Sequence, residues 1–199
     1  MKDMKRAPQK IYEDEAIILD IVPSAKLERG QHVERGMVVA QMVGWEYFTL
    51  LEAAINQSLN PKPGLRLYIG KDVPRQLVRI LRRISYQELT ENAKFTLEKV
   101  VEEIVKEREA ELVEFINTCG PLTPRLHALE ALPGVGKKIS MRLIEERSKA
   151  PFTSFKDIEE RAGIQNFDKM IIKRIIEELS DPNAKYWLFT RPPHPTSYG

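Results

Sequence analysis

Short apolar runs alternate with turn residues in the N-terminal third of the chain. Residues 15–22 form one run that ends at Pro23, and residues 37–43 form a second that ends at Gly44. Residues 65–69 then alternate apolar and polar positions with the period of two that is typical of a half-buried strand. Several short strands separated by glycine and proline turns predict a small sheet that is curled into a barrel.

The spacing of apolar positions becomes helical after Val73. Two interpretations of residues 45–51 stay open, because this run is compatible with a further strand or with a turn of helix through Ile55. The residues 119–121 (Cys-Gly-Pro) end the longest helical stretch, since glycine adopts the left-handed cap conformation and proline cannot continue a helix. Helices are therefore predicted over residues 74–84, 88–118, 123–132, 136–147, 155–161 and 168–179.

The most informative motif is the run LPGVGKK, which joins two of these predicted helices. Pro133 ends the first helix because it has no N–H to donate. Gly134 and Gly136 permit a positive φ and leave the backbone accessible to another molecule. Val135 lies between them and is expected to hold the turn in the core. The sequence therefore predicts a tight turn with a bare backbone.

The second helix of this motif opens with Lys137 and Lys138. The first N–H groups of a helix have no partner within it, and they lie at the positive end of its dipole. A phosphate oxygen can bind there whatever the neighbouring base. The two lysines add positive charge beside the site.

This motif resembles the helix-hairpin-helix motif of DNA repair, replication and RNA-associated proteins. The resemblance implies that the backbone N–H groups of Gly134 and Gly136 contact a sugar–phosphate backbone, supported by Lys137 and Lys138 and by a possible monovalent cation at the hairpin. Residues 151–161 resemble part of a second copy, but residues 162–167 lack Gly-x-Gly, so this copy is expected to be structural. The alternative for the first copy is a turn that merely joins packed helices or contacts a protein.

The chain as a whole resembles an uncharacterised archaeal family in which a barrel of the oligonucleotide/oligosaccharide-binding (OB) type precedes a helix-hairpin-helix region. The matching residues are 47–52, 68–71, 89–90 and 126–134. The implied fold is α+β in two parts, a small OB-like β-barrel followed by an all-helical helix-hairpin-helix region. The expected boundaries are 1–72 for the barrel, 73–120 for connecting helices, 121–182 for the helix-hairpin-helix domain and 183–199 for an aromatic, proline-rich tail.

A second group of candidate binding residues lies in and after the barrel. Arg66 and Lys71 flank Tyr68, a combination that suits single-stranded nucleic acid. On the predicted helix 74–84, four arginines recur on one face and form either a phosphate track or a face ion-paired to the acidic helix that follows: Arg75, Arg79, Arg82 and Arg83. Further aromatic residues could stack on bases but are more typical of core packing: Trp45, Tyr47 and Phe48.

The charge balance and the absence of catalytic motifs limit the functions that we expect of this chain. The 199 residues carry 31 basic and 29 acidic side chains, a net charge of +2, so nucleic-acid binding has to come from local patches. The three histidines, His32, His127 and His194, are scattered, and no nucleotide-binding or nucleophile motif occurs. We therefore expect no enzyme and no cofactor. A nuclease or nucleotide hydrolase with an undetected site is kept as an alternative.

The expected location is the cytoplasm. No apolar run approaches the length of a membrane span, and no signal peptide is recognisable. Cys119 is the single cysteine, which fits a reducing compartment. The aromatic residues 186–189 follow the last predicted helix, and they either pack back onto the protein or dock on a protein partner, together with the rest of the tail to residue 199.

These observations predict a non-catalytic protein that binds RNA or single-stranded DNA with little sequence preference. The nucleic acid would contact the hairpin residues Gly134 to Lys138 and the basic, aromatic surface of the barrel. The alternative function is a protein–protein interaction module in a nucleic-acid-processing complex.

Overall fold

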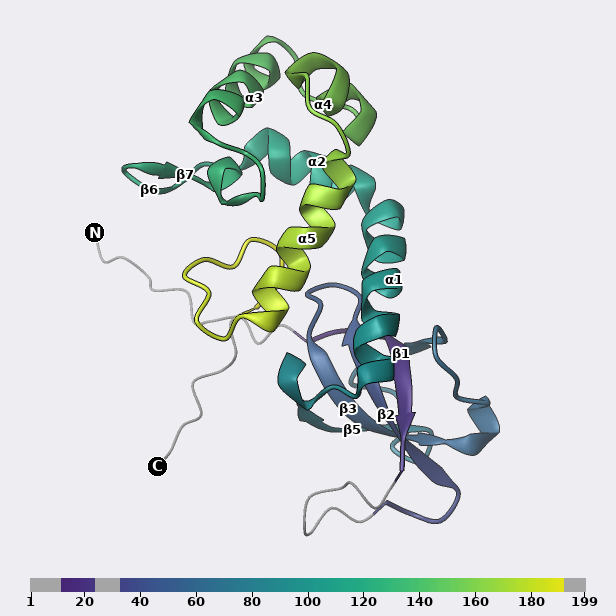
Figure 1. The fold of residues 1–199 in the computed structure, drawn as a ribbon. Helices are drawn as coiled ribbons and strands as arrows, with labels where there is room; N and C mark the ends of the chain where they lie inside the picture. Colours follow the sequence, from purple (N-terminus) through teal and green to yellow (C-terminus); the bar gives the residue numbers. More distant parts are fainter. Residues whose placement is uncertain (1–11, 24–32, 192–199) are drawn as a thin grey trace, which may run out of the picture. The chain divides into compact units, whose positions relative to one another are not determined.

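The structure, a computed structural model, describes residues 12–23 and 33–191. The chain divides into two compact units, the first ending at Arg83 and the second beginning at Ile84. Figure 1 shows a sheet in the first unit and helices in the second. The α+β class predicted from the sequence is confirmed. Within the described ranges, no helix is long and apolar enough to cross a membrane.

The first unit is a curled, five-stranded antiparallel sheet that forms a half-barrel (Figure 1). The predicted runs at 15–22, 37–43 and 65–69 are strands, and the interpretation of residues 45–51 as the start of a helix through Ile55 is wrong. The strands are β1 (Glu15–Val22), β2 (Met37–Gly44), β3 (Leu50–Asn56), β4 (Arg66–Tyr68) and β5 (Val78–Arg83), in the order β4-β1-β2-β3-β5.

The alternation along these strands places one set of side chains in a common core. Ile18, Met42 and Ile55 are fully buried in it, and each comes from a different strand. The registers of β1 with β2 and of β3 with β5 both shift by an irregularity, at Ile18/Asp20 and Glu52/Ala53. Such bulges bend strands and increase their twist, which accounts for the curl of the sheet.

The predicted basic helix at 74–84 is wrong. Residues 78–83 form β5, an edge strand that pairs with β3 from Val78 opposite Ile55 to Arg83 opposite Leu51. Pro74 instead begins a turn, in which its carbonyl accepts hydrogen bonds from the N–H groups of Leu77 and Val78. Pairing with a neighbouring strand thus overrides the helical spacing of the arginines, and this segment belongs to the first unit.

The described residues of the second unit form five α-helices: α1 (Glu91–Glu107), α2 (Glu109–Thr118), α3 (Lys137–Lys149), α4 (Phe155–Ala162) and α5 (Phe167–Ser180). The long helix predicted over 88–118 is interrupted at Arg108. Two caps precede this helix. Thr90 caps α1, and Ser85 with Glu88 forms a capping box around a short 3₁₀ turn. The helices predicted near 136–147, 155–161 and 168–179 are confirmed as α3, α4 and α5.

The helix predicted over 123–132 is wrong. A small hairpin of β6 (Pro121–Thr123) and β7 (Leu126–His127) precedes a 3₁₀ turn at Ala128–Ala131. His127 caps this turn: its Nδ1 accepts a hydrogen bond from the backbone N–H of Leu129, and its backbone N–H donates one to the Glu130 carboxylate. Pro133 leaves too few residues for a full α-helix after this cap.

The aromatic segment after α5 packs onto the second unit. Glu178 has a wholly buried side chain and accepts hydrogen bonds from the backbone N–H groups of Leu188, Phe189 and Thr190. Phe189 also makes an edge contact with Phe115, with ring centroids 5.1 Å apart. The prediction that residues 186–189 pack back onto the protein is confirmed. Residues 192–199 lie outside the described part of the chain.

Candidate functional site

The LPGVGKK motif forms a tight turn before α3. The N–H of Val135 is donated to the carbonyl of Leu132 at 3.0 Å, with Pro133 and Gly134 at the two central positions. Gly134 has a φ of +85°, the conformation that the third residue of a type II turn requires. Val135 is buried, so its side chain and its N–H both serve the turn and are not exposed to a ligand. Its prediction as a contact residue is therefore corrected to a structural role.

The turn leaves the first N–H groups of α3 unoccupied. The first hydrogen bond of the helix runs from the Ser140 N–H to the Gly136 carbonyl at 2.9 Å. Gly136 is the N-cap and has no side chain to accept a hydrogen bond from the helix. A Cβ at Gly136 would meet no atom within 4 Å, so the space beside it is open. The N–H groups of residues 136–138 have no acceptor among the described residues.

The charge at this helix start is positive. Lys137 and Lys138 are exposed and form no ion pair with any residue in the described ranges. No acidic residue lies in the first turn of α3, whereas α1, α2, α4 and α5 each carry one or more there. Acidic residues in the first turn are the usual complement of the helix dipole. Helix α3 therefore begins without the negative charge that the other helices have.

The start of α5 provides the contrast. Glu159 accepts the N–H of Phe167 at 2.8 Å, so a carboxylate of the same chain occupies this helix end. Glu159 precedes Gly163 by the same interval as Glu130 precedes Gly134. The Glu130 carboxylate instead accepts the N–H of His127 at 3.2 Å. It is held by its own cap and does not bind the start of α3.

The bend before α5 is closed by its own chain. Gly163 has a φ of +64°, and Arg142 donates a hydrogen bond to the Ala162 carbonyl at 3.0 Å. A Cβ at Gly163 would lie 3.0 Å from that guanidinium, so the bend has little free space. The bend at 162–167 therefore has a structural role, and of these two bends in the described part of the chain, the one at 133–136 presents the open helix end.

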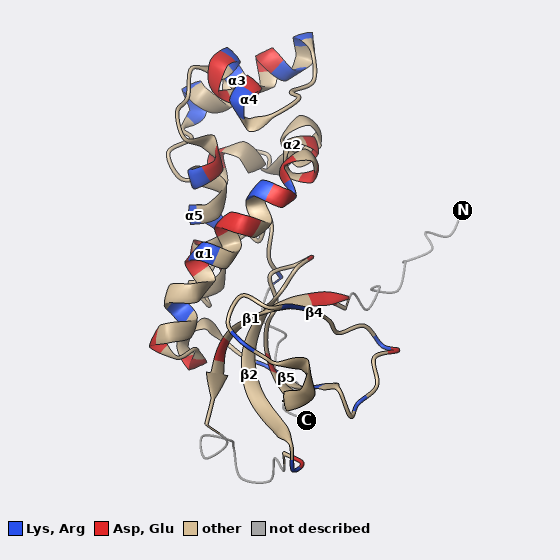
Figure 2. Ribbon diagram, turned by 90° about the vertical axis from the view of Figure 1, so that its right-hand side faces the viewer, with Lys and Arg blue, Asp and Glu red and all other residues tan. Residues whose placement is uncertain are grey.

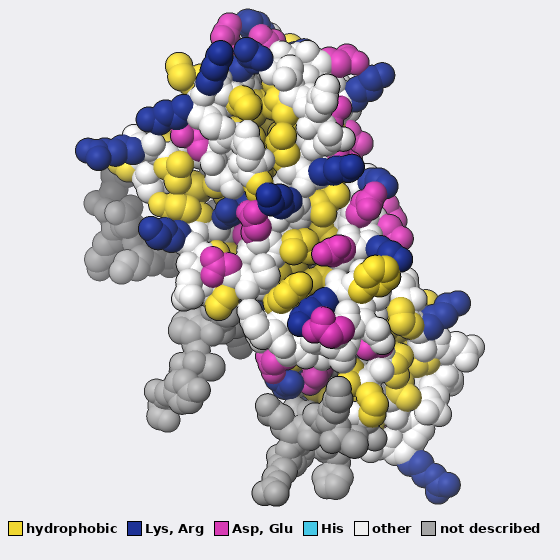
Figure 3. Space-filling model, viewed as in Figure 1, with side chains coloured by type: hydrophobic (Ala, Val, Ile, Leu, Met, Phe, Trp, Pro, Cys, Tyr) yellow, Lys and Arg dark blue, Asp and Glu magenta, His cyan; other side chains and the backbone are white. Residues whose placement is uncertain are grey.

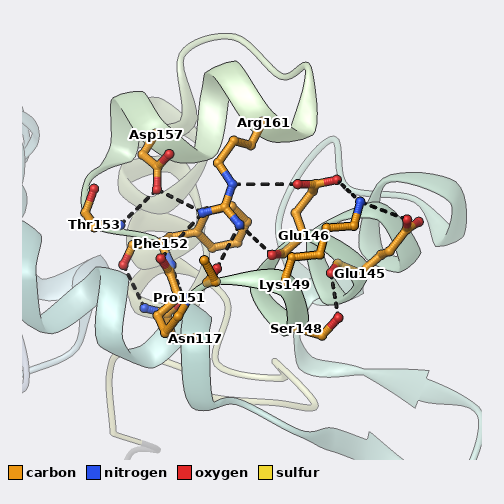
Figure 4. A network of polar contacts seen from close by, with 11 residues as sticks. Asn117, Glu145, Glu146, Ser148, Lys149, Pro151, Phe152, Thr153, Asp157 and Arg161 are labelled. Carbon is orange, nitrogen blue, oxygen red and sulfur yellow. Dashed lines mark hydrogen bonds and ion pairs between the residues drawn. The ribbon is translucent and has the colours of Figure 1, made fainter.

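Arg161 fixes the far end of α3 (Figure 4). Its guanidinium donates hydrogen bonds to the carbonyls of Glu146, Ala150 and Pro151, and it pairs with the Asp157 carboxylate at 3.1 Å. It also lies over the Phe152 ring, 4.5 Å from the centroid. One side chain of α4 therefore satisfies the last carbonyls of α3 and the loop after it, which holds the two helices together.

In the first unit, Arg66 and Tyr68 are exposed on β4. Arg66 is ion-paired with Glu15, and its guanidinium lies 3.4 Å from the centroid of the Trp45 ring. Tyr68 is 49% exposed and donates its hydroxyl to Asp72. This hydrogen bond raises the pKa of Tyr68 and lowers that of Asp72.

The other predicted residues of this unit differ in their surroundings. The Lys71 ammonium lies 4.3 Å from the centroid of the Tyr12 ring. Phe48 is buried, so it is a core residue and cannot stack on a base. Aromatic and basic side chains do meet near β4, but carboxylates accompany them. The net positive charge of the surface around Tyr68 is therefore smaller than the sequence suggests.

The four arginines after Tyr68 do not form one face, because their segment is not a helix. Arg79 and Arg82 stand opposite Ala54 and Glu52 in β3, on one side of the sheet. Arg82 pairs with Glu52 at 2.8 Å and is partly buried. Arg83 stands opposite Leu51 and so points to the other side, while Arg75 precedes the strand and is exposed. The predicted arginine track is wrong. Charges of both signs are likewise interspersed along the helices of the second unit (Figure 2).

Sequence reasoning missed a carboxyl pair, formed by the buried Glu13 and the partly buried Glu46. The Glu13 carboxylate accepts the backbone N–H groups of Glu46, Tyr47 and Thr49, at 2.8 to 3.2 Å. Burial, the hydrogen bond to Glu13 and the negative charge of Glu13 together raise the pKa of Glu46 to about 7. A Cβ at Gly44 would lie 2.0 Å from the Glu13 side chain, so this glycine is required for the pair. The signal in the sequence was only a glycine beside a turn.

The remaining candidates for chemistry are structural. Cys119 is buried, which raises the pKa of its thiol, and Arg147 binds its carbonyl at 2.8 Å. Burial lowers the pKa of His127, in keeping with its role as a neutral cap. Across residues 12–23 and 33–191, no group of three or more His, Cys, Asp or Glu side chains could hold a metal ion. His32 and His194 lie outside these ranges.

Comparison with known proteins identifies the family. A family model described as a protein of unknown function (DUF655) matches residues 12–191. The chain is 40% identical over 188 residues to uncharacterized protein MJ0038 of Methanocaldococcus jannaschii, covering 94% of this chain and 83% of that one. It is also similar to the crystal structure of Af1531 from Archaeoglobus fulgidus, with a TM-score of 0.76 and 45% identity over 90% of this chain and 100% of that chain. The resemblance to an uncharacterised archaeal family is thereby confirmed, and the chain belongs to the DUF655 family.

Proposed function

We propose that this protein binds the sugar–phosphate backbone of nucleic acid at the start of α3, in the manner of a helix-hairpin-helix motif. The observation that carries the proposal is an exposed helix end whose N–H groups and two lysines have no partner, and which has no carboxylate, among the residues that the structure describes. A phosphate oxygen there accepts backbone hydrogen bonds and interacts with the helix dipole. Such a contact does not depend on the base, so sequence preference is expected to be weak.

The second bend shows that this chain already uses an anion at a helix start. Glu159 accepts an N–H at the beginning of α5, where Asp168 also lies in the first turn. At α3 the corresponding glutamate, Glu130, is held by the His127 cap. An external phosphate would supply at α3 the negative charge that Glu159 supplies at α5.

A monovalent cation is compatible with the turn. The carbonyl oxygens of residues 133–135 accept no hydrogen bond from any described residue, and such oxygens are suitable ligands for a hard cation. These carbonyls would hold the ion, which would add positive charge beside the phosphate.

The OB-like sheet is proposed to contribute a second contact. Tyr68 offers half of its surface to solvent beside Arg66, which suits stacking on an unpaired base. Because Glu15 and Asp72 accompany these residues, we assign the main electrostatic contact to α3. RNA or single-stranded DNA is accordingly the proposed ligand, and no catalysis is proposed.

A fluorescence-anisotropy titration tests this function. Labelled single-stranded RNA, single-stranded DNA and duplex DNA are titrated at several salt concentrations. Binding is expected to weaken with salt at a log–log slope of about −0.7 to −0.9 for each phosphate neutralised. The Lys138→Gln variant should show a smaller slope, whereas Lys156→Gln, which removes an exposed lysine from α4, should not. No binding to any of these ligands at low salt contradicts the proposal.

A further inference from the structure

Met141 is an unusually exposed apolar side chain on α3. It is 70% exposed, more than any other large hydrophobic residue in the described ranges; the next is Phe95, at 65%. Ser140 and Leu143, its neighbours on α3, are buried, so the opposite side of the helix faces the core. Met141 therefore lies on the solvent side of α3. Figure 3 shows such apolar side chains lying among charged ones on one face of the molecule.

Met141 lies on the same face of α3 as Lys137 and Lys138. At about 100° per residue, Met141 lies roughly 40° from Lys137 and 60° from Lys138 around the helix axis, and so between them. It lies about one turn further along the helix, since the rise is roughly 1.5 Å per residue. The acidic residue that follows on this face, Glu145, is paired with Lys149 at 3.0 Å. The exposed surface at the start of α3 thus combines two cations with one apolar side chain.

This combination matches the chemistry of a nucleic-acid strand. Along one strand, charged phosphates alternate with sugars, whose C–H faces are apolar. Two lysines near successive phosphates leave a sugar between them, and an apolar, flexible methionine can pack on it. An inorganic polyphosphate has charge at every unit and offers no apolar surface. Positive charge alone therefore does not distinguish a nucleic acid from an inorganic polyphosphate, whereas an apolar contact from Met141 does.

We infer that Met141 packs on the sugar between the phosphates bound by Lys137 and Lys138, and that it makes this site prefer nucleic acid to other polyanions. The inference rests on the proposed function and adds a specificity-determining residue to it. Its contact is apolar, so it should contribute to affinity without changing the number of ions released.

The test compares the full-length protein with its Met141→Gln variant on two ligands, a single-stranded oligonucleotide and an inorganic polyphosphate of similar charge. Met141→Gln should weaken oligonucleotide binding about three- to tenfold, leave its salt slope unchanged and leave polyphosphate binding unchanged. Lys138→Gln should weaken both ligands and lower the slope. Phe95→Gln, which removes another exposed apolar side chain of the second unit, should change the affinity for neither ligand. Thermal unfolding checks that each variant is folded.

The outcomes separate the two proposals. If the wild-type protein binds the oligonucleotide through the lysines but Met141→Gln binds equally well, or loses both ligands equally, the role of Met141 is overturned and the proposed function stands. If the wild-type protein binds no oligonucleotide at low salt, the proposed function fails, and the inference about Met141 fails with it.

Discussion

The carboxylate of Glu159 accepts a hydrogen bond from the backbone N–H of Phe167 at 2.8 Å. This places an acceptor of the same chain at the start of α5. Within residues 12–23 and 33–191 the start of α3 has no such acceptor, although Glu130 stands at the corresponding distance before its bend. The proposed function depends on the difference between these two helix ends. Variants at the start of α5 and at the start of α3 test it.

Removing the Glu159 carboxylate should destabilise the second unit. Glu159→Ala leaves the Phe167 N–H without its acceptor and removes a favourable charge at a helix start, at a cost of about 1–2 kcal/mol in the free energy of unfolding. Glu159→Gln keeps an acceptor oxygen and should lose less. Urea unfolding followed by circular dichroism measures both variants. Equal loss in the two would mean that the hydrogen bond is not what matters.

Gly134→Ala should be destabilising because of the backbone conformation at that position. A φ of +85° is costly for any residue with a Cβ, and we expect a loss of about 1–2 kcal/mol. Space is not the reason, since the new Cβ would approach no atom closer than 3.6 Å. Gly120→Ala is the matched control, because this exposed glycine has open space and an ordinary φ. It should be neutral or slightly stabilising. Thermal unfolding compares the two, and similar melting temperatures would contradict the assigned turn.

The stability of the first unit should fall as the pH rises from about 4.5 to about 7. In the folded protein the pKa of Glu46 is raised to about 7, so the native state keeps a proton that the unfolded chain releases near 4.5. Stability therefore decreases with pH across this window, by about 1 kcal/mol once solvent screening of this half-buried group is included. Trp45 reports on the loop, with Trp187→Phe removing the second tryptophan signal. Glu46→Gln should abolish the dependence, and a dependence that persists would assign it to another group.

Glu178→Ala should release the aromatic tail. The substitution removes the acceptor for residues 188–190 and leaves the Arg174 guanidinium without its partner at 2.8 Å. We expect a loss of about 3 kcal/mol, since a buried ion pair is broken. Limited trypsin digestion should then cut faster after the exposed Lys185. Glu145→Ala, on the surface of α3, is the control and should leave the rate unchanged.

The parts of the fold that local chemistry determines were predictable from the sequence. Ser154 and Gly163 cap the two ends of α4, and Pro133 with Gly134 specifies the turn before α3. The error over residues 74–84 arose because a distant partner decides the structure. Residues 78–83 pair with β3, which no local pattern reveals, and their arginines therefore occupy two sides of a strand.

Only part of the candidate site could be predicted from the sequence. Its glycines and lysines are contiguous in the sequence, so the exposed helix end could be proposed before the fold was known. The contrast with α5 could not, because it depends on which way the Glu130 and Glu159 carboxylates turn. The pair of Glu13 and Glu46 was missed because its two members lie far apart in the sequence.

The most direct test of the central claim is the salt dependence of oligonucleotide binding in the wild-type protein and in the Lys137→Gln/Lys138→Gln double variant. We predict that the wild-type protein binds at low salt. We also predict that the double variant binds more weakly, with a log–log slope smaller by about 1.4 to 1.8, as expected for two lost phosphate contacts. Identical slopes in the two proteins would contradict phosphate binding at the start of α3.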